Sequence, residues 1–230
     1  STGLFGALYN AVVKDLTIED SYLYGLPDEN KAGMLAGYIY DTQIINCHVT
    51  NSKILAYFED GGPTKTYVAG LVAYANISNF SGCSYSGNIK VIHRKGYANV
   101  SGLVGNGLRS TLSDCRTSGT MTVSLEEIKS MFNSKNIYLS GLCHDATTIK
   151  GCLNGMDFVV KDANSSDTNT KDLRLCTMCY SVNKMSQSAN LGKITVEGVK
   201  GYEGILSNVF YTESCTIEDC AFYTIVEGTF

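Results

Sequence analysis

A short apolar motif recurs along the chain, and the fold prediction starts from this repeat. Its first residue is Gly in six of seven copies, and its second is always Leu, Met or Ile. The intervals between copies run from 27 residues (177 to 204) to 39 residues (102 to 141). Such variation predicts a constant structural element in each repeat, joined by loops of changing length. The copies begin at Gly3, Gly33, Gly70, Gly102, Gly141, Thr177 and Gly204.

Two further patterns follow each copy. An apolar residue precedes a small or apolar residue by three positions, and a later segment alternates apolar and polar residues, as in Ile89-Lys90-Val91. A period of two is typical of strands, so each repeat is expected to form three short strands joined by tight turns and closed by a longer loop. We call the first of these two patterns the second motif. In five copies the small or apolar residue that ends this second motif is a cysteine, namely Cys47, Cys83, Cys115, Cys152 and Cys220.

One such repeat has an apolar face that it cannot bury alone, and stacking the repeats buries it. The prediction is an all-β fold, a right-handed parallel β-helix (β-solenoid) of about seven coils, which forms a single domain over residues 1–230. Only 17% of the residues are charged and only two are Pro, which fits inward-facing strands and uninterrupted hydrogen-bond ladders. The Gly that begins each motif is expected at a tight corner or a positive φ.

The longer loops leave from the same corner of each coil, so we expect them to gather along one rim of the molecule. One loop starts with a capping box at Ser124-Leu125-Glu126-Glu127, followed by apolar residues at helical spacing. A short helical insertion is therefore predicted near 124–134.

Eight residues in or beside these loops are candidate ligand contacts. The aromatic rings suit a sugar-binding or protein-binding surface. The acids lie in neighbouring loops and could converge on calcium or a sugar, although ordinary solvated carboxylates would look the same. No motif indicates calcium, and no other cofactor is predicted. The aromatic candidates are Tyr57, Phe58, Tyr67 and Tyr97, and the acidic ones are Asp28, Glu29, Glu59 and Asp60.

The nine cysteines are interpreted as structural. Those that share one repeat position are expected to form an inward ladder of small side chains without a metal. Cys176 and Cys179 have the spacing of half a zinc or redox site, but Cys179 and Cys143 occupy a core position on successive coils. No metal site and no catalytic residue is predicted.

The three histidines also lack a catalytic motif. His48 is expected to point outward, and His144 and Asp145 are expected to form a polar pair at a turn. No nucleophile elbow, zinc-protease motif or phosphate-binding loop accompanies them.

Charge and hydropathy exclude two classes of partner. A net charge of −4 argues against nucleic-acid binding, which depends on a basic surface. No apolar run approaches the 18 residues or so of a transmembrane helix, and no secretory signal is recognisable.

The motif Gly102-Leu103-Val104-Gly105 followed by Asp114-Cys115 resembles the GLUG-type repeat, and the resemblance covers nearly the whole chain. The sixth and seventh copies depart from it. The resemblance implies a secreted or surface module of a longer, adhesin-like bacterial protein, and it carries over no catalytic or ligand-binding residue. The first coil has no polar cap ahead of it, which also indicates a fragment of a longer chain.

The expected function is therefore non-enzymatic adhesion or recognition at the cell surface or outside the cell. The loop rim would bind a glycan or a host or neighbouring protein, and the solenoid would serve as a stiff scaffold beside other domains of the same chain. One alternative is a carbohydrate-active enzyme, a polysaccharide lyase or glycoside hydrolase that uses acids of the rim. Another is a structural spacer that assembles end to end.

Overall fold

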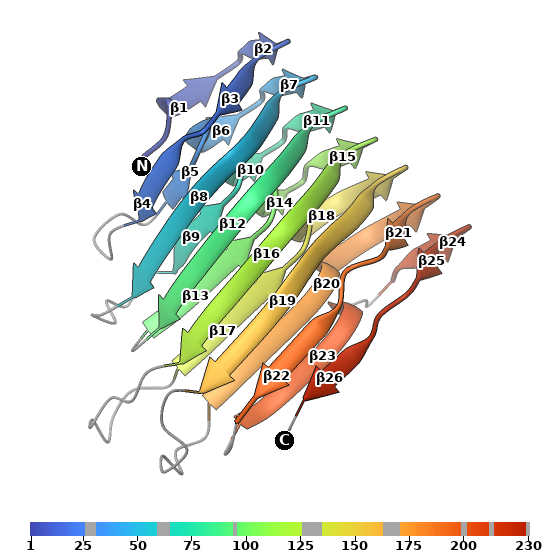
Figure 1. The fold of residues 1–230 in the computed structure, drawn as a ribbon. Coiled ribbons are helices and arrows are strands. Elements are labelled where there is room, and N and C mark those ends of the chain that lie inside the picture. Colours follow the sequence, from blue (N-terminus) through green and yellow to red (C-terminus); the bar gives the residue numbers. More distant parts are fainter. Residues whose placement is uncertain are drawn as a thin grey trace.

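The computed structural model describes residues 1–25, 31–58, 65–93, 96–125, 135–162, 171–198, 202–211 and 214–228. In these ranges the chain forms strands and turns and no helix, and every strand pairs in parallel with strands of adjoining repeats (Figure 1). The predicted all-β, parallel β-solenoid is thus confirmed. Among the same residues there is no helix long and apolar enough to cross a membrane.

Each coil has four sides, and equivalent strands stack into ladders along the axis. The first side contains β1 (Phe5–Tyr9), β6 (Ala36–Tyr40), β10 (Val72–Asn76), β14 (Val104–Leu108), β18 (Cys143–Lys150), β20 (Lys171–Ser186) and β23 (Tyr202–Tyr211). The short second side contains β2 (Val12–Lys14), β7 (Gln43–Ile45), β11 (Asn79–Ser81), β15 (Thr111–Ser113), later parts of β18 and β20, and β24 (Thr216–Glu218).

The third side is the longest and faces the viewer in Figure 1. It contains β3 (Thr17–Glu19), β4 (Tyr22–Gly25), β8 (His48–Phe58), β12 (Ser84–His93), β16 (Arg116–Leu125), β19 (Leu153–Asp162), β21 (Ala189–Asn190), β22 (Ile194–Glu197), β25 (Ala221–Phe222) and β26 (Val226–Gly228). The fourth side contains β5 (Lys31–Gly33), β9 (Thr66–Ala69), β13 (Gly96–Ser101), β17 (Lys135–Ser140) and the first parts of β20 and β23. The first-side ladder has seven levels in the described residues, of which the five inner ones have neighbours on both sides.

The corner between the second and third sides depends on a residue in the left-handed backbone region. Its φ lies between 50° and 63° at every level, and Gly, Asn and Asp adopt this conformation at the lowest cost. The corner residue immediately precedes the Cys or equivalent residue of the second motif, so the chain turns just before that side chain enters the core. The corner residues are Asp15, Asn46, Gly82, Asp114, Gly151, Gln187 and Asp219.

Of the six glycines that begin the first motif, Gly204 lies within β23 opposite Leu173, so the seventh copy is wrongly placed and is not equivalent to the others. The other five lie at a bend or directly before one, which is the corner that the sequence predicts, and none of them adopts the positive φ that was the alternative. Close approach between coils is the physical reason, because a Cβ on Gly102 would collide with the carbonyl oxygen of Gly141, and one on Gly70 with that of Gly102. Each glycine therefore makes room for the backbone of the next level.

Like residues stack on like residues inside the solenoid. Ile44, Phe80, Leu112 and Ile149 occupy one column in consecutive levels, and each is at most 1% exposed. The apolar column excludes water along the axis, and burial of this kind is the main stabilising term in folding.

The cysteine column lies beside it. Cys47, Cys83, Cys115 and Cys152 are buried and Cys220 is partly buried, and all are free thiols. Each thiol donates to the carbonyl oxygen two residues earlier, with sulfur–oxygen distances of 3.2 to 3.4 Å. In the sixth repeat the Ser188 hydroxyl makes the same contact at 2.8 Å. The position therefore favours a small side chain that can donate to a corner carbonyl, which is Cys at five levels and Ser at the sixth, whereas Leu16 occupies it at the first level.

The start of the predicted helix is wrong. Ser124 and Leu125 belong to β16, where they pair with Ile92 and His93 on one neighbour and with Lys161 and Asp162 on the other. The ladders on both sides extend the strand through the first two residues of the capping-box sequence. The remainder of the predicted helix, residues 126–134, lies outside the described residues.

Replacing Gly102 by Ala is expected to destabilise the fold by about 1–3 kcal/mol, because the new Cβ pushes two coils apart. Gly6→Ala is the matched control, since its nearest neighbour, the Ser1 carbonyl oxygen, lies 3.9 Å from the added Cβ. The control is expected to change stability by less than about 0.5 kcal/mol. Urea unfolding of both variants checks this, and equal effects would contradict the close-approach explanation.

Thiol accessibility tests the buried cysteines. Seven of the nine are buried, and Cys215 and Cys220 are intermediate. We expect at most these two to react quickly with Ellman's reagent in native protein, and all nine after unfolding in guanidinium, because the reagent needs access to the sulfur. Rapid reaction of most thiols without denaturant would show that the column does not face inward.

Candidate functional site

The outer faces of the first and fourth sides meet in a bend that we call the elbow. Tyr67 of β9 and Tyr74 of β10 lie edge to face across it, with ring centroids 5.3 Å apart. Alternation along the fourth side turns Val68 and Val100 into the core, so their neighbours in sequence point outward. The outward column consists of Tyr67, Asn99, Tyr138 and Arg174, which are register partners in adjoining strands.

Tyrosines and a lysine line the part of the elbow nearest the N-terminus. Tyr38 and Tyr74 stack with centroids 5.7 Å apart and an interplanar angle of 16°, and Tyr9 lies 5.7 Å from Tyr38. The Lys31 ammonium is 4.6 Å from the centre of the Tyr38 ring and 4.7 Å from that of Tyr74. Partial burial lowers the pKa of Lys31, and the two rings provide favourable cation–π contacts.

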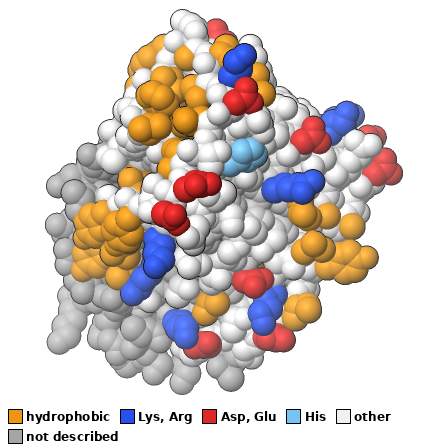
Figure 2. All heavy atoms as spheres, turned by 45° about the horizontal axis from the view of Figure 1, so that its top comes forward, with side chains coloured by type: hydrophobic (Ala, Val, Ile, Leu, Met, Phe, Trp, Pro, Cys, Tyr) orange, Lys and Arg blue, Asp and Glu red, His pale blue; other side chains and the backbone are white. Residues whose placement is uncertain are grey.

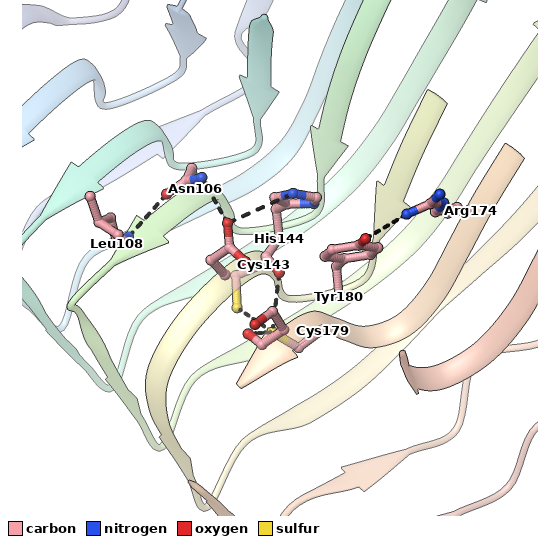
Figure 3. Close-up of polar contacts among 9 residues, drawn as sticks. Asn106, Leu108, Cys143, His144, Arg174, Cys179 and Tyr180 are labelled. Atoms are coloured by element: carbon pink, nitrogen blue, oxygen red, sulfur yellow. Dashed lines mark hydrogen bonds and ion pairs between the residues drawn. The ribbon is translucent and has the colours of Figure 1, made fainter. Parts of the chain in front are cut away.

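A second aromatic cluster surrounds His144 (Figure 3). The imidazole stacks on Tyr180 with centroids 4.5 Å apart, and Tyr138 meets both rings edge-on at 5.2 Å. Arg174 donates a hydrogen bond of 2.6 Å to the Tyr180 hydroxyl, and its guanidinium carbon lies 5.1 Å from the centre of the Tyr138 ring. Burial, reinforced by the positive charges of Lys65 and Arg174, lowers the pKa of His144 to about 3, so the ring is neutral at ordinary pH.

Asp145 supplies a carboxylate beside this cluster. It accepts a 2.9 Å hydrogen bond from the Asn106 side chain, whose oxygen in turn accepts one from the Leu108 backbone, as Figure 3 shows. Its oxygen lies 3.7 Å from His144 Nε2, so the polar pair predicted from the sequence does form. Burial raises the pKa of Asp145, while the Lys65 charge and the Asn106 hydrogen bond act in the opposite direction.

Several buried polar atoms near the bend between the fourth and first sides have no hydrogen-bond partner in the described part of the protein. They include the hydroxyls of Ser101 and Ser140, both 1% exposed, and Nδ1 of His144, which is 6% exposed. An unmade hydrogen bond at a buried polar group costs about 1–3 kcal/mol. A buried polar group of this kind calls for an explanation such as a functional role or a bound ion or water, so we take the elbow as the candidate site.

Two of the eight predicted contact residues, Tyr67 and Tyr97, belong to the elbow. Burial raises the pKa of Tyr67 to about 12, and the pKa of Tyr97 is also raised by burial and by its contact with Tyr138. Tyr57 and Phe58 end β8 on the third side instead, where Phe58 is 5% exposed and packs in the core. Asp28, Glu29, Glu59 and Asp60 lie outside the described residues, so a calcium or sugar site at the rim stays a prediction.

Sequence reasoning missed Asn106, Tyr138, Arg174 and Tyr180. For Tyr180 a signal was available through the repeat register, in which Gly37, Ala73, Gly105, His144 and Tyr180 are equivalent. Small residues at three levels give way to two rings at the next two, which is the point where the second aromatic cluster forms.

The low pKa of His144 has a consequence for stability. The unfolded chain takes up a proton near pH 6.5, whereas the folded chain does so only near pH 3, so this residue destabilises the fold as pH falls through that window. Between pH 7 and pH 4.5 its contribution is expected to be about 2–3 kcal/mol. In His144→Gln this part of the pH dependence should disappear while that of Asp145 remains, as measured by urea unfolding at the two pH values. An unchanged difference between the two pH values would contradict the buried, neutral imidazole.

Comparisons of the chain with protein-family models, with curated proteins and with solved structures found no match.

Proposed function

We propose that this chain is a recognition module that binds an acidic polysaccharide along the elbow. The observation that carries the proposal is the placement of cationic side chains against tyrosine rings along one face. Lys31 lies over Tyr38 and Tyr74, Lys65 Nζ lies 4.8 Å from the centre of the Tyr97 ring, and Arg174 contacts Tyr138.

Charge supports an anionic ligand. The whole chain carries a net charge of −4, yet the described elbow residues include three cations and a single carboxylate, that of Asp145. A locally positive surface on an acidic protein attracts and orients a polyanion. Tyrosine hydroxyls and the Asn106 amide add neutral hydrogen-bonding groups of the type that sugars use.

The dimensions support a chain-like ligand. Lys31 and Arg174 lie on β5 and β20 of the same ladder, four strand spacings apart. At ~4.8 Å per spacing this is roughly 19 Å, which several consecutive sugars could occupy. Tyr38 and Tyr74 stack on each other and the other tyrosine pairs meet tilted or edge-on, so the ligand would meet ring edges and hydroxyls. An extracellular or cell-surface location, where such polymers occur, is part of this proposal.

Affinity electrophoresis in gels containing polygalacturonate, alginate or hyaluronan tests the proposal, with neutral dextran as the comparison. The native protein should be retarded by at least one acidic polymer, and added salt should weaken the retardation because exposed charges are screened. The double variant Lys31→Gln/Lys65→Gln should raise the dissociation constant about tenfold or more.

Lys90→Gln is the matched control, because Lys90 is exposed on β12 of the third side, away from the elbow. Its affinity is expected to stay within about twofold of native, since a distant exposed charge acts weakly through solvent. Retardation by none of the acidic polymers, or equal binding by native protein and the double variant, would overturn the proposal.

A further inference from the structure

A pocket of about 360 Å³ lies at the corner between the second and third sides, remote from the elbow. Its lining includes His48, Ser84 and Arg116, the first residues of β8, β12 and β16, which are register partners on three consecutive levels. Gly82, Cys83 and Asp114 complete the lining. Figure 2 tips this corner toward the viewer, and basic and acidic side chains are scattered over the face singly and in small groups.

A chain of hydrogen bonds runs across three levels to this pocket. Ser84 Oγ lies 2.8 Å from His48 Nδ1, and His48 Nε2 lies 2.8 Å from Asn46 Oδ1. On the other side of the amide, Asn46 Nδ2 donates to Asp15 Oδ1 at 2.8 Å. Nucleophile, base and orienting group thus stand within the distances seen in hydrolytic sites.

The network also assigns the proton on the imidazole. An ionised carboxylate only accepts hydrogen bonds, so Asp15 requires the nitrogen of the Asn46 amide on its side. The amide oxygen therefore faces His48, and His48 Nε2 must carry the hydrogen that it accepts. Nδ1 is left with a lone pair directed at the Ser84 hydroxyl, which is the tautomer that a general base needs.

From this geometry we propose that Ser84 and His48 form a hydrolytic site for carboxylic esters, with Asn46 and Asp15 as positioning residues. Ser84 Oγ attacks the acyl carbon, and its proton passes to His48 Nδ1. As the bond to the alcohol oxygen breaks, His48 returns the proton to the departing alcohol. Water then attacks the acyl-serine, gives a proton to His48, and releases the acid while Ser84 Oγ regains its hydrogen.

The pocket favours a neutral ester. Arg116 neighbours Ser84 in the ladder and can stabilise the negative charge that develops on the carbonyl oxygen. Asp114 places a carboxylate in the same lining, so the charges of the pocket balance and an anionic substrate gains little. His48 and Ser84 are partly exposed, which leaves them open to a ligand.

The test uses the purified chain, a fluorophosphonate probe, and hydrolysis of p-nitrophenyl acetate. Mass spectrometry should find the phosphonyl adduct on Ser84 of native protein. Ser84→Ala should abolish the adduct, and His48→Gln should slow ester hydrolysis by about 10²- to 10⁴-fold, the usual contribution of a general base. Asn46→Gly, which tolerates the positive φ of that corner, should lower kcat with KM unchanged.

Ser86→Ala is the matched control, because Ser86 lies two residues along β12 and is also partly exposed. Its labelling and hydrolysis should equal those of native protein. All these positions are on the surface, and circular dichroism would verify that each variant folds. An adduct no stronger than in heat-unfolded protein, or one that survives His48→Gln unchanged, would overturn the hydrolytic site.

Discussion

Parallel hydrogen bonding in register between successive coils is the constraint on which the rest of this structure depends. It places every residue directly against its equivalent in the neighbouring repeats, at the ~4.8 Å spacing of paired strands. A side chain is therefore selected chiefly by the level above and the level below. The motif glycines follow from this rule, because a Cβ on one level would enter the carbonyl of the next.

The same constraint organises the polar groups inside the solenoid. Thr117, Asn154 and Asn190 are buried at equivalent positions and join in a line of hydrogen bonds of 2.6 and 2.7 Å. Thr224 extends the line at 2.9 Å. Each member satisfies the next, so the polar column is tolerated in an apolar core, as the cysteine column is through its contacts with corner carbonyls.

Both surfaces that carry functional proposals are products of stacking. The elbow brings residues of separate repeats together, so that an imidazole, two phenols and a guanidinium form one cluster. The corner pocket aligns His48, Ser84 and Arg116 because each begins the third side of its own coil. Neither site is visible as a local motif, since each also needs residues that are about one repeat apart in the chain, such as His48 with Ser84 and His144 with Tyr180.

The sequence by itself determined the repeat, the parallel strands, the inward cysteines and the outward direction of His48, because these follow from periodicity within each coil. It placed Phe58 among the surface residues and Ser124 in a helix, since local pattern does not reveal how far a strand extends along its neighbours. Only the tertiary structure decided which outward side chains meet. Contacts such as Tyr67 with Tyr74 and His48 with Ser84 depend on the bend between sides and on the register between coils. The residue spacing within a single repeat predicts neither the bend nor the register.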